Sequence, residues 1–491
     1  MISSQPLEVT RNLISLERGE DELLLINSFH MQPLYVARGR ARFKQLLSRL
    51  PTGRALEQLK ADFPESAKQI QLLRDYHILI SPSTDKERFT ASEMAEMSVA
   101  PRTRNRMTAY LLLAEFCNLG CVYCLNGSET YLRNEPSLMT PDTAIRSLTT
   151  CLDQLNPGGH LEVAFFGGEP LLNWDGIKEV IRRCEGDLRQ QYPDKRITYH
   201  LTSNLTVCPP GLIEYIRDYN IALVTNIDGP AEIHDRLRPY RNGKPSYAKT
   251  VETIRRLTDA GLPVALRATI SSLNEDHIPE VAALHKELGA VSSAIVPMSP
   301  VNSDRNFIPI ELLPNPDKVI SGLIQAYRSG IWAKDKLFPF NQYLLKLRPG
   351  GRQVKACSAP SGTMPVVRVN GDVYVCIYLV GQEPYRFGTL EGPWDHNPLA
   401  EMARSLHVDG VAICQDCAWR YSCGGGCPVQ SFSEGAWKDE PAVAEYIRRI
   451  KCDFTQAILV ELLWDSADAA KAGVFSNPPA SSEVADIAHN C

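Results

Sequence analysis

Cysteine is the residue type that points most clearly to chemistry in this sequence. Ten of its fourteen cysteines fall into two groups, Cys117-x3-Cys121-x2-Cys124 and seven more between Cys357 and Cys452. Thiolates are soft ligands that select iron–sulfur clusters or zinc, and a cubane [4Fe–4S] cluster normally takes four of them. The first group offers only three, which leaves one coordination position open, as in catalytic metal sites. The pattern therefore predicts iron–sulfur clusters, one of them at a reactive centre.

The composition describes a globular protein whose cysteines are available for metals. The chain has 491 residues, 44% hydrophobic and 22% charged, which suits two to four domains and excludes a fibrous or disordered protein. Its net charge of −5 argues against a nucleic-acid partner. No signal-peptide core opens the sequence, and no apolar run approaches the roughly 20 residues that span a bilayer, so we expect a cytoplasmic protein without a membrane partner. In that reducing compartment cysteines serve metals or catalysis rather than disulfides.

An alternation of strands and helices begins near Thr108 and must position the first cysteine group. Strands are expected at residues 110–114, 160–166, 197–202, 222–227, 264–270 and 292–296. Helices are expected between them, for example at residues 140–155, 174–190 and 247–260. Strict alternation implies a parallel sheet, and six units are too few for a closed barrel, so we expect an α/β fold with a partial (β/α)6 TIM-like barrel over residues 106–337. Ligands bind at the carboxyl ends of such strands, where the loop from Cys117 to Cys124 begins.

Further regions flank this barrel. Residues 1–83 are ordered as strand, helix, turn, helix and strand, which predicts an N-terminal winged helix-turn-helix domain, although its acidic second helix argues against DNA binding. Residues 84–105 are polar and aperiodic and predict a linker. Residues 338–460 are rich in glycine and proline and hold the second cysteine group, and residues 461–491 predict a loosely packed tail.

The loop Cys117-Asn-Leu-Gly-Cys-Val-Tyr-Cys124, with an aromatic residue before its last cysteine, resembles the signature of the radical S-adenosylmethionine (SAM) superfamily. The resemblance implies that three thiolates hold a [4Fe–4S] cluster whose fourth iron is chelated by the amino and carboxylate groups of SAM. It also implies reductive cleavage of SAM to a 5′-deoxyadenosyl radical that abstracts hydrogen from a substrate. Zinc is the alternative metal for these three cysteines, but zinc sites favour paired Cys-x2-Cys elements and four ligands.

Further segments follow in the order expected from this resemblance. Residues 166–170 read Phe-Gly-Gly-Glu-Pro and resemble the Gly-Gly-Glu motif that meets the methionyl amine of SAM. Residues 225–238 resemble a segment of the peptide-modifying branch, in which Asn226 replaces a SAM-binding serine. The SAM contacts implied by these matches and by the end of the third strand are Tyr123, Gly167, Gly168, Glu169, Ser203, Asn204, Asn226 and Arg238. Asp228 and His234 are open to two interpretations, an acid/base pair or caps of an Asp-Gly turn, and turn chemistry favours the second.

The second cysteine group reproduces the seven-cysteine signature of the SPASM domain, with spacings such as Cys357-x13-Gly371-x4-Cys376. The resemblance implies two auxiliary [4Fe–4S] clusters, and hence three clusters in the chain. The distal cluster would be held by Cys414, Cys417, Cys423 and Cys452. The cluster nearer SAM would be held by Cys357, Cys376 and Cys427, which is one thiolate short. Either a non-cysteine residue completes that site, or its iron stays open to a substrate thiolate.

No catalytic base can be assigned from the sequence. Relatives that mature sulfatases carry an aspartate directly after the cysteine that matches Cys376, whereas this chain has Ile377, which disfavours formylglycine formation. Asp372, Tyr378 and Asp416 are nearby candidates, but loop residues of these types are more often surface or turn residues. Outside the two groups, Cys151, Cys184 and Cys208 are expected to be small buried hydrophobic residues, and Cys491 to have no role.

Together these resemblances imply a radical SAM maturase, an enzyme that modifies a ribosomally made peptide or small protein subunit. The N-terminal region is similar in element order to PqqD-like peptide-recognition domains, which implies that a leader peptide docks on residues 1–83 by adding a strand to a sheet edge. The primary hypothesis is oxidative formation of a thioether or carbon–carbon cross-link, with electrons from a donor such as flavodoxin or ferredoxin. The alternatives are another peptide oxidation, such as formylglycine formation or oxidative decarboxylation, and a non-catalytic iron–sulfur protein. Cluster ligands generate the radical without choosing its target, so the substrate stays open.

Overall fold

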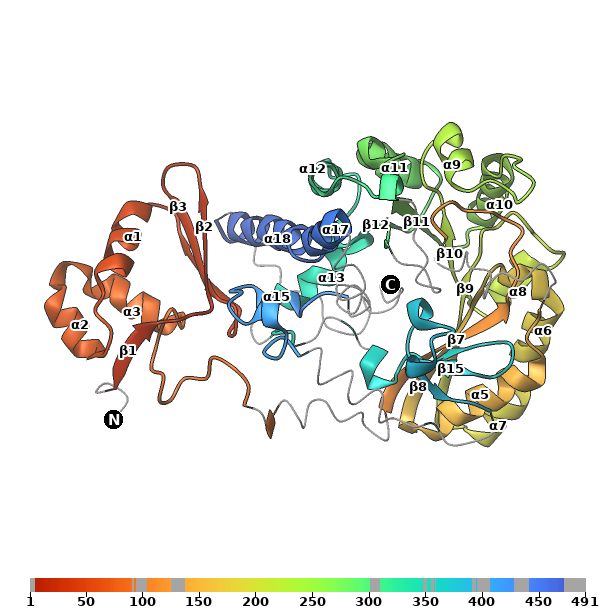
Figure 1. Ribbon diagram of the computed structural model, residues 1–491, viewed down its shortest axis with the longest axis horizontal. Coiled ribbons are helices and arrows are strands. Elements are labelled where there is room, and N and C mark those ends of the chain that lie inside the picture. Colours follow the sequence, from red (N-terminus) through yellow and green to blue (C-terminus); the bar gives the residue numbers. More distant parts are fainter. Residues whose placement is uncertain are drawn as a thin grey trace.

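The protein extends from an N-terminal region at one end to a large sheet wrapped by helices at the other (Figure 1). The computed structural model describes residues 5–90, 92–93, 104–124, 137–300, 310–347, 351–354, 357, 359–390, 394, 407–427 and 441–471. Half of the expected linker (residue 91 and residues 94–103), and residues 472–491 with Cys491, lie outside these ranges.

One ten-stranded sheet organises the larger end, in the order β13-β12-β11-β10-β9-β8-β7-β14-β15-β16. Its strands are β7 (Arg104–Ala114), β8 (Leu155–Gly167), β9 (Arg196–Thr202), β10 (Ala222–Asn226), β11 (Val264–Ile270), β12 (Ser292–Pro297), β13 (Leu337–Phe338), β14 (Val366–Val367), β15 (Val373–Tyr374) and β16 (Arg386–Gly388). All pairs from β13 to β14 are parallel, and β15 and β16 are antiparallel. The six expected strands and the open, partial barrel are confirmed. The number of parallel strands, however, is eight, because two-residue strands such as β13 and β14 carry no detectable pattern.

Helices cover the outer face of this sheet (Figure 1). They are α5 (Pro141–Asp153), α6 (Trp174–Arg183), α7 (Arg189–Gln191), α8 (Leu212–Asp218), α9 (Ala231–Leu237), α10 (Tyr247–Asp259), α11 (Ile278–Glu287) and α12 (Pro316–Arg328). The start of α5 is defined by Thr140, whose hydroxyl accepts a hydrogen bond from Thr143 N, and by Pro141 at the first position. Cys151 and Cys184 are fully buried in the core between helices and sheet, and Cys208 packs against it half-buried, as expected.

The N-terminal region contains two small sheets and three helices. The meander is β2 (Leu13–Arg18), β3 (Glu22–Asn27) and β4 (Gln32–Val36); β1 (Pro6–Val9) pairs with β5 (Arg54–Ala55) and β6 (Leu79–Ile80); the helices are α1 (Arg40–Arg49), α2 (Leu56–Asp62) and α3 (Ala67–Asp75). Alternate residues of β3 face opposite sides: Leu23 and Leu25 join the core under the helices, whereas Leu24 and Ile26 pack on α18 (Asp453–Lys471). Both faces of the meander are therefore covered, and only its edges are open to a new strand.

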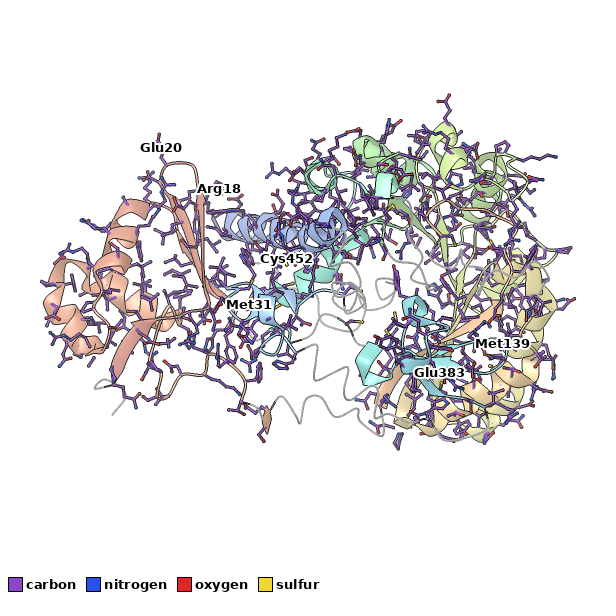
Figure 2. The ribbon with its side chains drawn as sticks, viewed as in Figure 1. Arg18, Glu20, Met31, Met139, Glu383 and Cys452 are labelled. Carbon is purple, nitrogen blue, oxygen red and sulfur yellow. The ribbon has the colours of Figure 1, made fainter. Side chains whose placement is uncertain are left out.

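The C-terminal part joins the two ends of the molecule. Its helices are α13 (Phe340–Leu344), α15 (Arg420–Cys423), α17 (Pro441–Lys451) and α18. Helix α18 runs beside β2 and β3, where Arg18 bonds Asp468 at 2.5 and 2.8 Å, and Ser422 of α15 contacts Met31 (Figures 1 and 2). The expectation of a loose tail from residue 461 is wrong up to Lys471, because Leu463, Trp464 and neighbouring apolar residues dock on the meander.

A buried ion pair fastens the C-terminal part to the barrel. Arg368, just beyond β14, donates two hydrogen bonds to Glu115, at 2.7 and 2.9 Å, and Glu115 directly follows β7. This pair fixes β14 beside the strand that carries the first cysteine group. Among the described residues, no helix combines the length and apolarity needed to cross a bilayer.

Candidate active site

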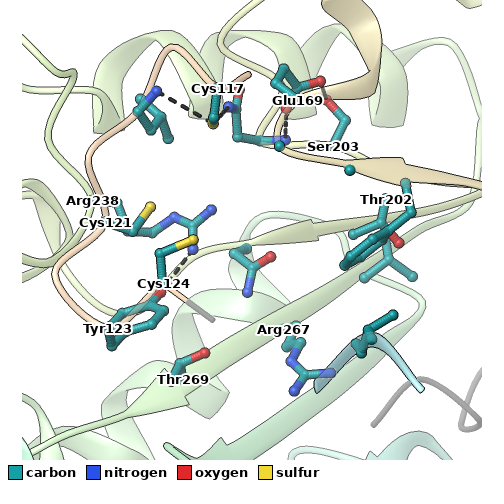
Figure 3. A pocket seen from close by; sticks show the side chains of 18 of the residues that line it. Cys117, Cys121, Tyr123, Cys124, Glu169, Thr202, Ser203, Arg238, Arg267 and Thr269 are labelled. Atoms are coloured by element: carbon teal, nitrogen blue, oxygen red, sulfur yellow. Dashed lines mark hydrogen bonds between the residues drawn. The ribbon is translucent and has the colours of Figure 1, made fainter. Parts of the chain in front are cut away.

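A cavity of about 200 Å³ lies at the carboxyl ends of the parallel strands (Figure 3). Its walls include the three cysteines of the first group and all eight residues expected to contact SAM: Cys117, Cys121, Cys124, Tyr123, Gly167, Gly168, Glu169, Ser203, Asn204, Asn226 and Arg238. These residues come from segments more than 100 positions apart in the sequence, so their meeting at one cavity is a consequence of the parallel topology.

The cysteine loop is held by a second segment that runs beside it. Gly120 N donates to Pro239 O at 2.8 Å and Val122 N donates to Leu237 O at 3.0 Å, while Arg241 N donates back to Asn118 O at 3.1 Å. These backbone bonds leave the loop little freedom. They also place Arg238, in the middle of the second segment, next to the thiol of Cys121.

A buried chain of hydrogen bonds links the loop to two strands. Tyr123 OH donates to one oxygen of Asp228 and accepts a hydrogen bond from Arg238 Nη1 at 2.7 Å. The other oxygen of Asp228 accepts from Thr269 N of β11 at 2.9 Å. Burial raises the pKa of Asp228, and Arg238 opposes that shift. With both oxygens occupied inside the protein, Asp228 orients the site and is poorly placed to act as an acid or base.

His234 has a similar supporting role. Its ring is fully buried, and Nδ1 accepts a hydrogen bond from Asp228 N at 3.4 Å. Burial lowers its pKa to about 3, with a smaller contribution from Arg238, so the ring is neutral at physiological pH. The geometry therefore agrees with the turn-capping interpretation of Asp228 and His234.

The Gly-Gly-Glu motif supports the cysteine loop directly. A Cβ on Gly167 would lie 2.7 Å from Ala114 O, and one on Gly168 would lie 2.3 Å from Phe116 O, so both positions require glycine for contact with the end of β7. Glu169 is buried and accepts hydrogen bonds from Ser203 Oγ at 2.7 Å, Asn204 N at 2.7 Å and Leu171 N at 3.0 Å. The side chain of Glu169 thus joins β8 to the end of β9.

Ser203 and Asn204 use their polar groups within the protein. The Ser203 hydroxyl is engaged by Glu169, and Asn204 Nδ2 donates to Asn118 Oδ1 at 2.9 Å and contacts Cys117 Sγ at 3.7 Å. Both residues line the cavity, but these bonds assign them first to positioning the cysteine loop. Asn226, at the end of β10, presents its amide at the cavity wall.

Several lining residues were not expected from the sequence. Alternate residues of β11 face inward, which brings Arg267 and Thr269 into the cavity across from the cysteine loop (Figure 3). The alternation of apolar and polar residues from Leu266 to Ile270 is the sequence signal that could have identified them. Ile377 and Tyr378 reach the cavity from the C-terminal part, so two regions build its wall. Of the other candidate bases, Asp372 pairs with Arg386 at 3.2 Å, and Asp416 is exposed.

The three thiols fit a cluster better than a single ion. Burial raises the pKa of Cys117 above its usual range and that of Cys121 to about 12, and the neighbouring thiols add to both shifts, whereas Arg238 lowers the pKa of Cys121. Close, buried thiols resist losing protons to water, and iron can replace those protons. Three thiols leave one of the four ligand positions of a structural zinc site unfilled, whereas in a cubane cluster each thiolate would bind its own iron.

The second cysteine group divides between two places. Cys414, Cys417, Cys423 and Cys452 line one small cavity of about 20 Å³. Burial raises the pKa of Cys414 to about 12 and that of Cys452 to about 11, and the other thiols of this set add to both shifts. These four thiols therefore border one cavity, and their role as the ligands of one cluster stays a prediction. Cys376 and Cys427 pack against the main core, and the grouping of these two with Cys357 stays a prediction.

Residues 111–285 match the Radical SAM superfamily. The chain is 28% identical over 266 residues to the uncharacterized protein MJ0907 of Methanocaldococcus jannaschii, covering 54% of this chain and 82% of that protein. It is 23% identical over 356 residues to the serine-type anaerobic sulfatase-maturating enzyme of Bacteroides thetaiotaomicron, covering 65% and 82%. The solved structure of native anSMEcpe with bound AdoMet has a TM-score of 0.59 at 17% identity, covering 74% of this chain and 99% of that one, and the same protein is also known with a bound Cp18Cys peptide.

Proposed function

We propose that this radical SAM enzyme modifies a peptide or small protein subunit by hydrogen abstraction followed by oxidative thioether or carbon–carbon cross-linking. The observation that carries this proposal is the cavity itself, in which three thiols and eight expected SAM contacts meet beside residues of the cysteine-rich C-terminal part. When bound, the cluster and SAM supply a 5′-deoxyadenosyl radical. We take residues 106–337 as the radical SAM domain and residues 338–460 as a SPASM domain with two auxiliary clusters.

The chain's own residues hold and shield this chemistry. Cys117, Cys121 and Cys124 would hold the cluster, and the backbone bonds of the loop fix their spacing. Arg238 places a buried positive charge beside the open side of the loop, where a carboxylate would be stabilised. The apolar wall formed by Val224, Met298 and neighbours keeps water from a reactive substrate.

One residue of the C-terminal part supports the choice of cross-linking among the peptide oxidations. Ile377 lines the cavity at the position where the sulfatase-maturation resemblance carries an aspartate, so no carboxylate occupies that place. This favours cross-linking over formylglycine formation, although relatives include sulfatase-maturating enzymes. A substrate thiolate on the three-cysteine auxiliary cluster of Cys357, Cys376 and Cys427 would suit thioether formation. A flavodoxin or ferredoxin would supply the first electron.

Within residues 1–83, one edge of the meander β2-β3-β4 suits the docking of a peptide strand. Ser28 N donates to Asn12 O at 3.0 Å, and hydrogen-bonded pairs alternate with non-hydrogen-bonded pairs along β2 and β3. The N–H and C=O groups of Leu13, Ser15 and Glu17 therefore point away from β3. On the opposite edge, Pro33 of β4 pairs with Ile26 and has no N–H to offer an added strand. We therefore place the docking peptide on β2. Ser15→Pro should weaken peptide binding at least about tenfold, whereas Ser15→Ala should not.

Two measurements test the proposal. Reconstituted protein with SAM and a strong reductant should release 5′-deoxyadenosine, and Cys124→Ala should not; equal release from both would refute the radical chemistry. Incubation with short cysteine-containing or acidic peptides encoded nearby should give products two hydrogens lighter by mass spectrometry and without a new aldehyde, because oxidation of serine to formylglycine also removes two hydrogens. Release of 5′-deoxyadenosine with a new aldehyde or a different mass change would favour the other peptide oxidations, and no iron-dependent activity at all would favour the non-catalytic alternative.

A further inference from the structure

An aromatic junction connects the N-terminal region to the C-terminal part. It consists of Phe29 from the turn after β3, Phe89 from the segment after β6 and Tyr421 of α15, with ring centroids 4.9, 5.5 and 6.1 Å apart. Beside these rings, Met31 Sδ accepts a hydrogen bond from Ser422 Oγ at 3.0 Å (Figure 2). The turn that contains Phe29 and Met31 therefore carries a contact between these two parts of the chain.

Two histidine rings are stacked next to this turn and form what we call the histidine pair. His30 follows Phe29, and His77 lies between α3 and β6; their ring centroids are 4.0 Å apart and their planes differ by 9°. Asn27 links the two backbones, because its Nδ2 donates to His77 O at 2.9 Å and its Oδ1 accepts from Phe29 N at 3.0 Å. His77 has a left-handed backbone with φ +57°, which residues other than glycine rarely adopt, so the surrounding fold holds this ring in place.

The histidine pair has no provision for added protons. His30 Nε2 and His77 Nδ1 are buried, and within the described ranges neither nitrogen has a hydrogen-bond partner. A proton on either nitrogen would create a buried N–H group without an acceptor. Protons on both would also place two positive rings 4.0 Å apart, where they repel each other.

Charged groups approach the histidine pair from three segments. They are Arg74 of α3, Asp85 and Lys86 of the segment after β6, and Arg352 of the C-terminal part. Asp85 acts on both rings, but Arg74 and Ser81 N already bind its carboxylate. Lys86 pairs with Glu93, and the positive charge of Arg352 disfavours a proton on His30. The surroundings therefore favour a neutral His30.

Acid favours opening of the junction for this reason. Burial, and after it His77, lowers the pKa of His30 to about 4 from an ordinary value of 6.5, although a hydrogen bond to the backbone of Lys86 opposes the shift. In an open junction the ring is in water and takes up its proton near the ordinary value, so the open state binds more protons between pH 6.5 and pH 4. With these two values, acidification from pH 7 to pH 5 shifts the equilibrium toward the open state by roughly twentyfold.

We propose that the histidine pair is an acid-sensitive contact that controls how the N-terminal region is held against the C-terminal part. While His30 is neutral, the stacked rings keep Phe29 and Met31 seated on α15. Protonation of His30 releases this turn. The meander keeps its apolar contact with α18, so the N-terminal region changes its orientation without detaching. The inference concerns the placement of this region and holds whether or not a peptide docks there.

Hydrogen exchange measured by mass spectrometry on the anaerobically purified protein tests this contact. The reporters are the amides of His30, Met31 and Phe89, which donate to Asn27 O at 3.1 and 2.9 Å and to Asp409 at 3.3 Å. After correction for intrinsic exchange rates, their protection should fall roughly twentyfold between pH 7 and pH 5, while that of β3 stays constant. Unchanged protection of the reporters overturns the inference. An equal loss across β3 also overturns it, because the whole N-terminal region would then be unfolding.

Substitutions assign the effect to the histidine pair. In His30→Gln the side chain cannot take up a proton, so the reporters should show no fall in protection between pH 7 and pH 5. His77→Asn removes the neighbouring ring with a residue that tolerates a left-handed backbone, and it should make the fall smaller. His277→Gln is the matched control, because His277 is half-exposed in the barrel and contacts Glu280 at 2.7 Å, and it should keep the fall of the parent. A full fall in both His30→Gln and His77→Asn would show that another group is responsible and would overturn the inference.

Discussion

The two cavities that contain cysteines differ in size and in how their charges are arranged. The barrel cavity is about 200 Å³ and is lined by two arginines, Arg238 and Arg267, of which Arg238 is engaged by Tyr123 beside Asp228. The four-thiol cavity is about 20 Å³ and is bordered by buried cations. Three thiols with room beside them suit a cluster that binds a further ligand, whereas four thiols in a confined space suit a cluster saturated by protein. The cavity with fewer thiols therefore has the larger free volume, which is the arrangement that the proposed function needs for SAM at one site and an electron-carrying cluster at the other.

The largest expected effect is that cysteine substitutions at the two sites remove different products. Cys124→Ala should abolish release of 5′-deoxyadenosine, because it removes a ligand from the cavity that has room for SAM. Cys417→Ala should retain that release but lower the yield of cross-linked product, because only electron removal is affected. Chromatography of both products in parallel gives their ratio. Loss of 5′-deoxyadenosine from correctly folded Cys417→Ala would show that the two sites are not functionally separate.

The next effect tests whether the two regions fold as one body. Glu115→Ala leaves the buried guanidinium of Arg368 without its carboxylate, and breaking such a pair costs about 3–5 kcal/mol. We expect a lower thermal midpoint and a separate early transition for the C-terminal part, measured by calorimetry on the anaerobically purified protein. Glu383→Ala, which removes an exposed partner of Arg386 in the same region, is the control and should change stability by less than about 1 kcal/mol. A single unshifted transition for Glu115→Ala would argue that the pair is dispensable.

The position of the barrel site can be predicted from the sequence because each pattern that marks it lies within one short segment. Period-two and helical patterns locate the strands, and the spacing of the first cysteine group places its loop after β7. The partners of Glu115 and of β3 could not be predicted, because they lie more than 250 and 430 residues away and depend on packing. Arg267 was missed because no motif marks it, and the sequence alone does not tell which face of β11 lines the cavity of the partial barrel.

A smaller effect examines the positioning of Arg238 in the barrel cavity. Tyr123→Phe removes the hydroxyl that connects Arg238 to Asp228, and leaving buried charged groups without this bond costs about 1–3 kcal/mol. SAM binding to reconstituted protein, measured by equilibrium dialysis, should weaken by roughly tenfold. Tyr240→Phe is the control, because Tyr240 lies in the segment beside the cysteine loop and, in the part of the chain that the structure describes, makes no side-chain hydrogen bond with Arg238. Equal affinities for the two variants would show that Arg238 keeps its place without Tyr123.

The smallest effect concerns protons in the barrel region. His234 has a pKa of about 3 when folded against an ordinary value of 6.5, so the unfolded chain binds more protons between these values. The stability that the neutral ring provides is therefore complete above about pH 6.5 and is lost as the pH falls toward 3. His234→Asn cannot titrate, and the dependence of its unfolding free energy on pH should be shallower than that of the parent by up to about 1.4 kcal/mol per pH unit. Denaturant titrations at pH 5 and pH 7 measure this difference. An equal pH dependence of the unfolding free energy for parent and variant would mean that His234 is already protonated in the folded protein. A protonated ring could not accept the hydrogen bond from Asp228 N at Nδ1, so this outcome would contradict the described geometry.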